Sequence, residues 1–242
     1  MNILLTGSDG FIGRHLHNFL KTNHKVICID KETGNDLLSC DLKHSVDLVI
    51  HLAGLSGVRD SLGRPEEYWV QNVIAGQRLF DFFKDTRILY ASSSTAHEPW
   101  KNPYAMSKYS LERIAPANSM GMRFTTVYGP NARETMLIPR ILRNDVPYIN
   151  TNHSRDFLHV DDLVRAIDTL MKSNLRGVTD IGSGTTNNLV ELIEYFGIDC
   201  ERVVGEQSER LDNLADNTLL NKIGWSPKIN LYDYIKENRN DN

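Results

Sequence analysis

The stretch that decides the fold is "NILLTGSDGFIGRHL", Asn2 to Leu16. A short apolar run, typical of a buried strand, leads into three glycines, Gly7, Gly10 and Gly13, at the opening of an amphipathic helical pattern. Small residues at such a turn let the backbone approach a pyrophosphate, whose charge is met by amide groups at the helix N-terminus. The GxxGxxG spacing in this context predicts a dinucleotide site, with a tight turn that binds nothing as the alternative.

A carboxylate at the end of the second predicted strand indicates which dinucleotide binds. Asp30 closes "KVICID" (Lys25 to Asp30) and follows Gly13 by 17 residues. An acidic residue at this place can accept hydrogen bonds from an adenosine ribose and would repel a 2′-phosphate. The sequence therefore favours NAD over NADP, with the neighbouring Lys31 as the one residue that argues the other way.

Strand and helix patterns alternate along the first half of the chain. This alternation predicts a doubly wound parallel α/β sheet, a Rossmann domain, over residues 1–130. After residue 130 prolines break the regularity, and we expect 131–242 to form mainly a small C-terminal substrate-binding lobe, with 155–182 returning to the first domain. The buried strands are expected at Asn2 to Thr6, Lys25 to Asp30, Asp47 to Ala53 and Arg87 to Ser92.

Composition limits the partners. With 242 residues and a net charge of −4, the chain is not a general nucleic-acid binder. No apolar run approaches the roughly 18 residues of a membrane span, so we expect a cytoplasmic protein that does not bind membranes. The three cysteines, Cys28, Cys40 and Cys200, are widely spaced and predict neither a disulfide framework nor a metal site.

The stretch "PYAMSK", Pro103 to Lys108, carries candidate chemistry. Tyr104 and Lys108 are four residues apart at the start of a predicted helix, so they share one helix face. An ammonium near the phenol would lower the phenol pKa. Taken alone, a tyrosine and a lysine at this spacing are common on solvated helix faces.

Further motifs stand in order around this pair. The motifs are "TGSDGFIG", "DL" at Asp41 and Leu42, "HLAG" at His51 to Gly54, "SSS" at Ser92 to Ser94, Tyr104 with Lys108, "MRFTTVYGP" at Met122 to Pro130, "RDFLHVDD" at Arg155 to Asp162, "DIGSG" at Asp180 to Gly184 and "IGWSPK" at Ile223 to Lys228. Together they resemble the extended short-chain dehydrogenase/reductase family, in its NAD-dependent epimerase/dehydratase group, over nearly the whole chain.

The resemblance implies roles for individual residues. Tyr104, as a phenolate, would take a proton from a sugar hydroxyl while hydride leaves the same carbon for NAD, with Lys108 lowering the phenol pKa and Ser94 bonding the reacting oxygen. The family often forms homodimers, which we expect here. The cofactor-binding residues implied are Gly7, Asp9, Gly10, Phe11, Ile12, Gly13, Asp30, Asp41, Leu42, Leu52, Ala53, Gly54, Asn72, Tyr104 and Lys108.

Within the family the chain looks like a shortened UDP-glucuronate 4-epimerase. Thr95 and Ala96 stand where 4,6-dehydratases carry an Asp-Glu pair, so dehydration is disfavoured. "RFTTVYGPNAR" places Thr126 and Arg133 where that subfamily holds the sugar carboxylate, and a guanidinium suits this planar anion. The substrate-binding residues implied for a UDP-sugar are Arg59, Ser93, Ser94, Thr126, Arg133, Arg155, Arg210 and Asp212.

Departures from the family pattern leave other readings open. The segment before Pro103 and the loop between "YGP" and "RDF" are both trimmed, so the lid over the sugar is expected to be incomplete. UDP-glucuronate decarboxylation, or another nucleotide-sugar redox change, uses the same Tyr-Lys pair. A non-catalytic NAD-binding regulator is the alternative of another class. The presence of Ser94, Tyr104 and Lys108 together argues against it, since dinucleotide binding alone needs no phenol.

Overall fold

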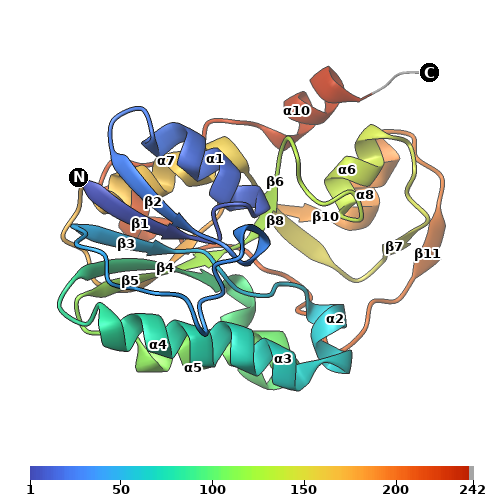
Figure 1. The fold of residues 1–242 in the computed structure, drawn as a ribbon. Coiled ribbons are helices and arrows are strands. Elements are labelled where there is room, and N and C mark those ends of the chain that lie inside the picture. Colours follow the sequence, from blue (N-terminus) through green and yellow to red (C-terminus); the bar gives the residue numbers. More distant parts are fainter. Residues whose placement is uncertain (240–242) are drawn as a thin grey trace.

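A six-stranded parallel sheet forms the centre of the protein in the computed structural model, which describes residues 1–239 (Figure 1). Its strand order is β2-β1-β3-β4-β5-β9. The chain runs from β1 outward to β2 and then crosses to the other side of β1, so the carboxyl ends of β1 and β3 border a topological switch point, where such sheets bind ligands. The strands are β1 (Asn2–Thr6), β2 (Lys25–Ile29), β3 (Leu48–His51), β4 (Arg87–Ser93), β5 (Ser119–Phe124) and β9 (Gly177–Ile181).

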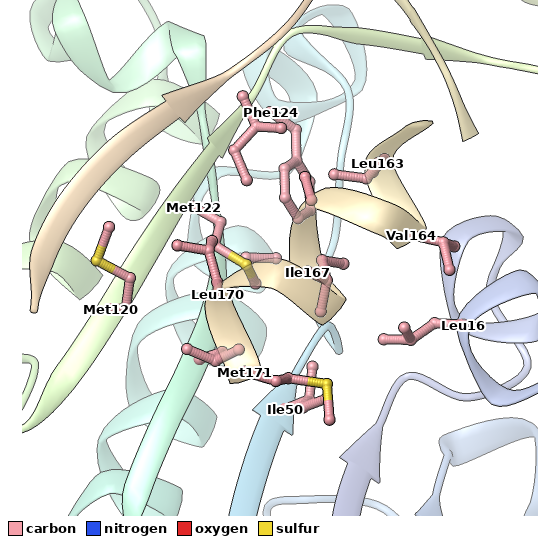
Figure 2. Close-up of a cluster of buried hydrophobic side chains, with 14 of the residues drawn as sticks. Leu16, Ile50, Met120, Met122, Phe124, Leu163, Val164, Ile167, Leu170 and Met171 are labelled. Atoms are coloured by element: carbon pink, nitrogen blue, oxygen red, sulfur yellow. The ribbon is translucent and has the colours of Figure 1, made fainter. Parts of the chain in front are cut away.

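Helices cover both faces of this sheet. On one face lie α1 (Phe11–Leu20) and α7 (Val160–Met171), and Figure 2 shows Leu16 of α1 and Ile167 and Leu170 of α7 among the buried side chains of that layer. On the other face lie α4 (Ala75–Phe82) and α5 (Pro103–Ile114), with α2 (Val58–Gly63), α3 (Pro65–Trp69) and a π-helical turn at Val70–Ile74. The predicted doubly wound α/β class is confirmed.

The remaining elements form a smaller layer beside the carboxyl ends of the large sheet (Figure 1). A three-stranded sheet has the order β10-β8-β6, a two-stranded sheet pairs β11 with β7, and three helices bury a separate apolar cluster around Ile141, Leu192 and Ile235. The elements of this layer are β6 (Thr126–Tyr128), α6 (Leu137–Leu142), β7 (Tyr148–Asn150), β8 (Ser154–His159), β10 (Thr186–Asn188), α8 (Leu189–Tyr195), β11 (Glu201–Val203) and α10 (Leu231–Asn238). Helix α9 (Thr218–Lys222) instead packs against β9 of the large sheet.

The segment expected to return to the first domain divides between the two layers. Its α7 and β9 pack on and join the large sheet, whereas β8 pairs with β6 in the smaller one. Residues 240–242 of the expected C-terminal lobe lie outside the described residues. Within residues 1–239, none of the helices combines the length and the apolar character that crossing a membrane requires.

Candidate active site

A cleft of about 1100 Å³ lies between the large sheet and the smaller layer. It brings together most of the residues that the sequence singled out, although these come from segments far apart in the chain. Among its lining residues are Gly7, Gly10, Phe11, Ile12, Gly13, Leu52, Gly54, Arg59, Ser93, Ser94, Tyr104, Lys108, Thr126, Arg133, Arg155 and Arg210. The expected residues outside this lining are Asp9, Asp30, Asp41, Leu42, Ala53, Asn72 and Asp212.

The glycine turn at one end of the cleft is fitted to close packing and to an anion. A Cβ at Gly13 would stand 1.9 Å from the Gly7 carbonyl oxygen, and Gly7 itself has a φ of 73°. Gly10 is the N-cap of α1 and provides no side-chain hydrogen bond to the first helical amides. Amide groups at this uncapped N-terminus border the cleft and are suited to a pyrophosphate, so the residues present fit a dinucleotide.

Two acidic residues expected to bind the cofactor, Asp30 and Asp41, follow β2 in the chain. The Asp30 carboxylate accepts hydrogen bonds from the Asp9 amide at 2.8 Å and from the Glu32 amide at 3.0 Å, which fixes its position beside the glycine turn. Asp41 is exposed and accepts from the Lys43 amide. Leu42 is buried in the core rather than in the cleft.

The loop after β3 is braced from beneath by Asn72. Its side chain accepts from the Leu55 amide at 2.7 Å and donates to the Leu55 carbonyl at 3.0 Å and to the Ser107 hydroxyl at 2.9 Å. A Cβ at Gly54 would stand 2.7 Å from the Asn72 oxygen, so the loop needs glycine there. Asn72 thus supports the loop that contains Ala53 and Gly54 from beneath.

Helix α5 delivers the tyrosine and the lysine to the cleft. Pro103 stands in its first turn, and the Asn102 side chain caps it by accepting from the Ala105 amide at 2.8 Å. The Lys108 ammonium is buried and donates to the Ala91 carbonyl at 3.1 Å. Burial lowers the pKa of Lys108 to about 8, against the opposing charge of Glu112.

The Tyr104 phenol differs from the expectation in its pKa. Burial raises the pKa of Tyr104, and the groups that oppose this are Ser93 and Arg133 rather than Lys108, so the expected more acidic phenol is not seen in the protein by itself. The hydroxyl within reach of the phenol is that of Ser93, whereas Ser94 offers its carbonyl to Arg210 at 2.6 Å. Ser93 and Ser94 both line the cleft, and the contact expected between Ser94 and the reacting oxygen of the sugar stays a prediction.

Thr126 and Arg133 stand in the wall of the cleft that the smaller layer provides. The Thr126 hydroxyl accepts from the Asn213 side chain at 3.1 Å. Arg133 is exposed, and its charge acts on the phenols of both Tyr104 and Tyr68. Among the described residues, no carboxylate or other acceptor is found paired with the Arg133 guanidinium. Its charge is available to an anion in the cleft.

Two arginines meet at Glu209, a residue that the sequence did not single out. Its carboxylate accepts from Arg59 at 2.9 Å and from Arg155 at 3.1 Å, so it bridges helix α2 and strand β8. Burial lowers the pKa of Arg155, which Glu209 opposes. An acid within the "ERLD" segment was visible in the sequence, but nothing local showed that it would meet Arg59, 150 residues away.

The expected late pair, Arg210 and Asp212, separates. Arg210 lines the cleft, bonds the Ser94 carbonyl and lies 3.2 Å from a Glu98 oxygen. Asp212 instead accepts from the Thr186 hydroxyl at 2.9 Å and from the Leu214 amide at 2.7 Å, away from the cleft lining. Within residues 1–239, no group of three or more His, Cys, Asp or Glu side chains is placed to hold a metal ion.

Comparison with known proteins gives a consistent family. The model of the NAD dependent epimerase/dehydratase family matches residues 3–182. MoeE5, solved with UDP-glucuronic acid and NAD, is 29% identical, with a TM-score of 0.85 over 99% of this chain and 97% of its own. MoeE5 has also been solved with UDP-glucose and NAD. The UDP-glucuronic acid 4-epimerase of Bacillus cereus, solved with UDP-glucuronic acid and NAD, is 26% identical, with a TM-score of 0.83 over 98% of this chain and 99% of its own.

A curated relative shows how this chain differs in length. The UDP-glucuronate 4-epimerase of Thermodesulfobacterium geofontis (strain OPF15) is 25% identical over 98% of this chain and 94% of its own. The alignment extends over 313 positions, more than the 242 residues of this chain, so the relative carries insertions that are absent here. This agrees with the trimmed loops inferred from the sequence.

Proposed function

The chain belongs to the NAD dependent epimerase/dehydratase family, and on that premise we propose that its substrate is a UDP-hexuronic acid, UDP-glucuronate or UDP-galacturonate, which it interconverts at C4. It is an NAD-dependent nucleotide-sugar epimerase. The observation that carries the choice of sugar is the unpaired Arg133 guanidinium, which faces the same cleft as Tyr104. A guanidinium binds a planar carboxylate through paired, charge-assisted hydrogen bonds.

Tyr104 is proposed to move the proton of the reaction. NAD, when bound, supplies the hydride acceptor and returns the hydride to C4. The phenolate of Tyr104 takes the proton of the C4 hydroxyl, and Ser94 bonds the same oxygen, with Ser93 beside the phenol. Lys108, tied to the Ala91 carbonyl, holds its ammonium below the loop after β3. The same groups return the proton when hydride comes back to the other face of the 4-keto sugar.

The carboxylate contact has a further chemical purpose. A ketone at C4 lies beta to the C5 carboxylate, and such an acid loses carbon dioxide when the breaking bond aligns with the carbonyl π system. Thr126 and Arg133 are proposed to hold the carboxylate out of that alignment while the pyranose turns, and Arg155 to hold the pyrophosphate about which it turns. UDP-glucuronate decarboxylation or another redox change is the rival within the class, because the same residues would serve it.

The cofactor is NAD, and Asp30 is proposed to select it over NADP. Its carboxylate is fixed by two backbone amides beside the glycine turn, where the adenosine ribose is expected. Three free cysteines agree with a reducing compartment, and a cytoplasmic location is part of the proposal.

A homodimer is also proposed, through α4, α5 and the π-helical turn before α4. These elements present apolar side chains to solvent on the outer face of the domain, including Ile74, Phe82, Met106 and Tyr109. The helices that carry these exposed side chains contact one another, and large apolar side chains gathered on one exposed face are typical of protein interfaces. Light scattering of the purified protein tests this; a monomer at micromolar concentration would contradict it.

The decisive experiment for the substrate is a panel of UDP-sugars and GDP-sugars incubated with protein and NAD, with products separated by chromatography. The proposal expects UDP-glucuronate and UDP-galacturonate to interconvert, with no pentose formed. A pentose product would favour the decarboxylase, and preference for UDP-glucose would leave only a general nucleotide-sugar epimerase. Binding of NAD without turnover of any sugar would favour the non-catalytic regulator.

A further inference from the structure

Helix α5 carries a third ionisable side chain on the face that holds Tyr104 and Lys108. Glu112 follows Lys108 by four residues, as Lys108 follows Tyr104, so the three side chains lie one turn apart along one face. The end of β4 reaches all three. The Ser93 side chain lies by the Tyr104 phenol, the Ala91 carbonyl accepts from Lys108, and the next residue of the strand contacts Glu112.

The Glu112 carboxylate is buried and held at both oxygens. Its side chain is only 4% exposed. Oε1 accepts from the Ser92 hydroxyl at 2.5 Å and from Arg123 Nε at 2.8 Å, and Oε2 accepts from Arg123 Nη2 at 2.6 Å. A bidentate guanidinium pair with an added hydroxyl bond fixes the orientation of a carboxylate. Glu112 has no contact with the cleft, so the proposed reaction does not use it directly.

We propose that Glu112 is a positioning residue of the reaction: its carboxylate, fixed by Ser92 and Arg123, keeps the ammonium form of Lys108 in place one helical turn from Tyr104. The proposal rests on the proposed function in taking Lys108 to act as an ammonium. Burial alone would favour the neutral amine, since a buried lysine without a nearby anion releases its proton. Glu112 is the anion whose charge opposes this at Lys108.

The surroundings leave Glu112 as the main electrostatic partner of Lys108. From β3, His51 faces Lys108; burial and the lysine charge lower the pKa of His51 to about 3, so it is a neutral imidazole. From α5 itself come Tyr104 and Glu112. Glu112 in turn faces Tyr90 and Ser92 of β4 and Arg123 of β5. Beyond Arg123 lie His97, in the turn after β4, and Asp180 of β9.

Replacing Arg123 should shift the pKa of Lys108 in the direction opposite to replacing Glu112, and this makes the proposal testable. The Arg123 guanidinium neutralises much of the Glu112 charge and also lies 3.2 Å from the His97 ring nitrogen Nδ1. The other ring nitrogen of His97 bonds the Asp180 carboxylate at 2.9 Å. Removing the Glu112 charge lowers the pKa of Lys108, whereas removing the Arg123 charge exposes Lys108 to more of the carboxylate and raises it. A contact that only ties α5 to the sheet would lower stability in both variants and move the lysine in neither direction.

The experiment follows Lys108 itself and needs no sugar turnover. Full-length protein with isotope-labelled lysine, saturated with NAD, is titrated by NMR, with the Lys108 signal assigned from Lys108→Met. In Glu112→Gln, which keeps the shape of the side chain, we expect the pKa of Lys108 to fall by about one unit, a tenfold change in the deprotonation equilibrium. Glu112→Asp, which keeps the charge, should leave the pKa of Lys108 close to its wild-type value. Arg123→Met should raise the pKa of Lys108.

The outcomes separate this proposal from the proposed function. An unchanged Lys108 pKa in Glu112→Gln, or shifts of the same sign in Glu112→Gln and Arg123→Met, overturns the positioning role whatever sugar the protein uses. If one variant does not fold, as judged by thermal unfolding, the other still gives the sign. Where UDP-sugar turnover is observed, Glu112→Gln should lower kcat at alkaline pH with KM unchanged, while a sugar panel without turnover counts only against the proposed function.

Discussion

Replacing Arg133 by alanine should remove the discrimination between a uronic acid and a neutral sugar. The guanidinium lines the cleft without a partner among the described residues, so its loss should leave the fold intact. A hydrogen bond to a charged group contributes about 1.5 to 3 kcal/mol. At about 1.4 kcal/mol per tenfold, this predicts roughly 10-fold to 150-fold weaker binding of UDP-glucuronate. Binding of UDP-glucose should be nearly unchanged.

The assay must be binding rather than turnover. Arg133 also lowers the pKa of Tyr104, so Arg133→Ala leaves less of Tyr104 as the phenolate at a given pH and slows turnover of both sugars. Calorimetric titration of the NAD-saturated protein with each UDP-sugar separates the two effects. Arg140→Ala is the matched control, because Arg140 lines the same cleft but its Nε already bonds the Thr135 carbonyl at 3.0 Å. Equal losses of affinity for both sugars in Arg133→Ala would refute the carboxylate contact.

Three further predictions concern the base, the cofactor and the core. Tyr104→Phe should keep the fold and NAD binding yet lose turnover by about a hundredfold or more, and normal turnover of UDP-sugars would make the phenol structural. NAD should bind more tightly than NADP in calorimetric titration because Asp30 stands at the ribose position, and equal affinities would contradict this. Burial lowers the pKa of His51 to about 3 in the folded protein. Between pH 6.5 and about pH 3 the unfolded chain therefore binds more protons at His51 than the folded protein does, so the free energy of unfolding should fall as the pH drops through this window. Urea unfolding at about pH 7 and pH 5, with His51→Gln reducing the difference, tests it; a pH-independent midpoint would count against it.

Local sequence signals predicted the frame of the fold well. The expected strand at Asn2 to Thr6 coincides with β1, and the apolar runs ending at Asp30 and Ser92 lie within a residue of β2 and β4. Tyr104 and Lys108 lie at the start of a helix, as expected, and α5 begins at Pro103 because a proline in the first turn and an asparagine cap are encoded next to each other. Each of these features depends on neighbours in sequence.

Features that depend on distant contacts were not predicted. Within the motif "MRFTTVYGP" the chain passes at Thr125 from β5 of the large sheet to β6 of the small one, because Thr126 pairs with Phe157 rather than with a neighbour of β5. Glu209 joins the cleft only because Arg59 and Arg155 meet there.

The charge of Arg133 links substrate choice to the chemistry of Tyr104, and this has a consequence for pH dependence. In the free protein, Arg133 is one of two groups that lower the pKa of Tyr104 against the effect of burial. A bound sugar carboxylate would neutralise that guanidinium, whereas the hydroxymethyl group of UDP-glucose would not. The phenol should then be less acidic with UDP-glucuronate, so kcat should begin to rise at higher pH than with UDP-glucose. Hydride transfer followed by nicotinamide absorbance against pH measures this. With UDP-glucose, which leaves the guanidinium charged, Arg133→Ala should move the rise in kcat to higher pH because it removes a charge that lowers the phenol pKa. An unchanged UDP-glucose profile in Arg133→Ala would show that Arg133 does not act on the phenol.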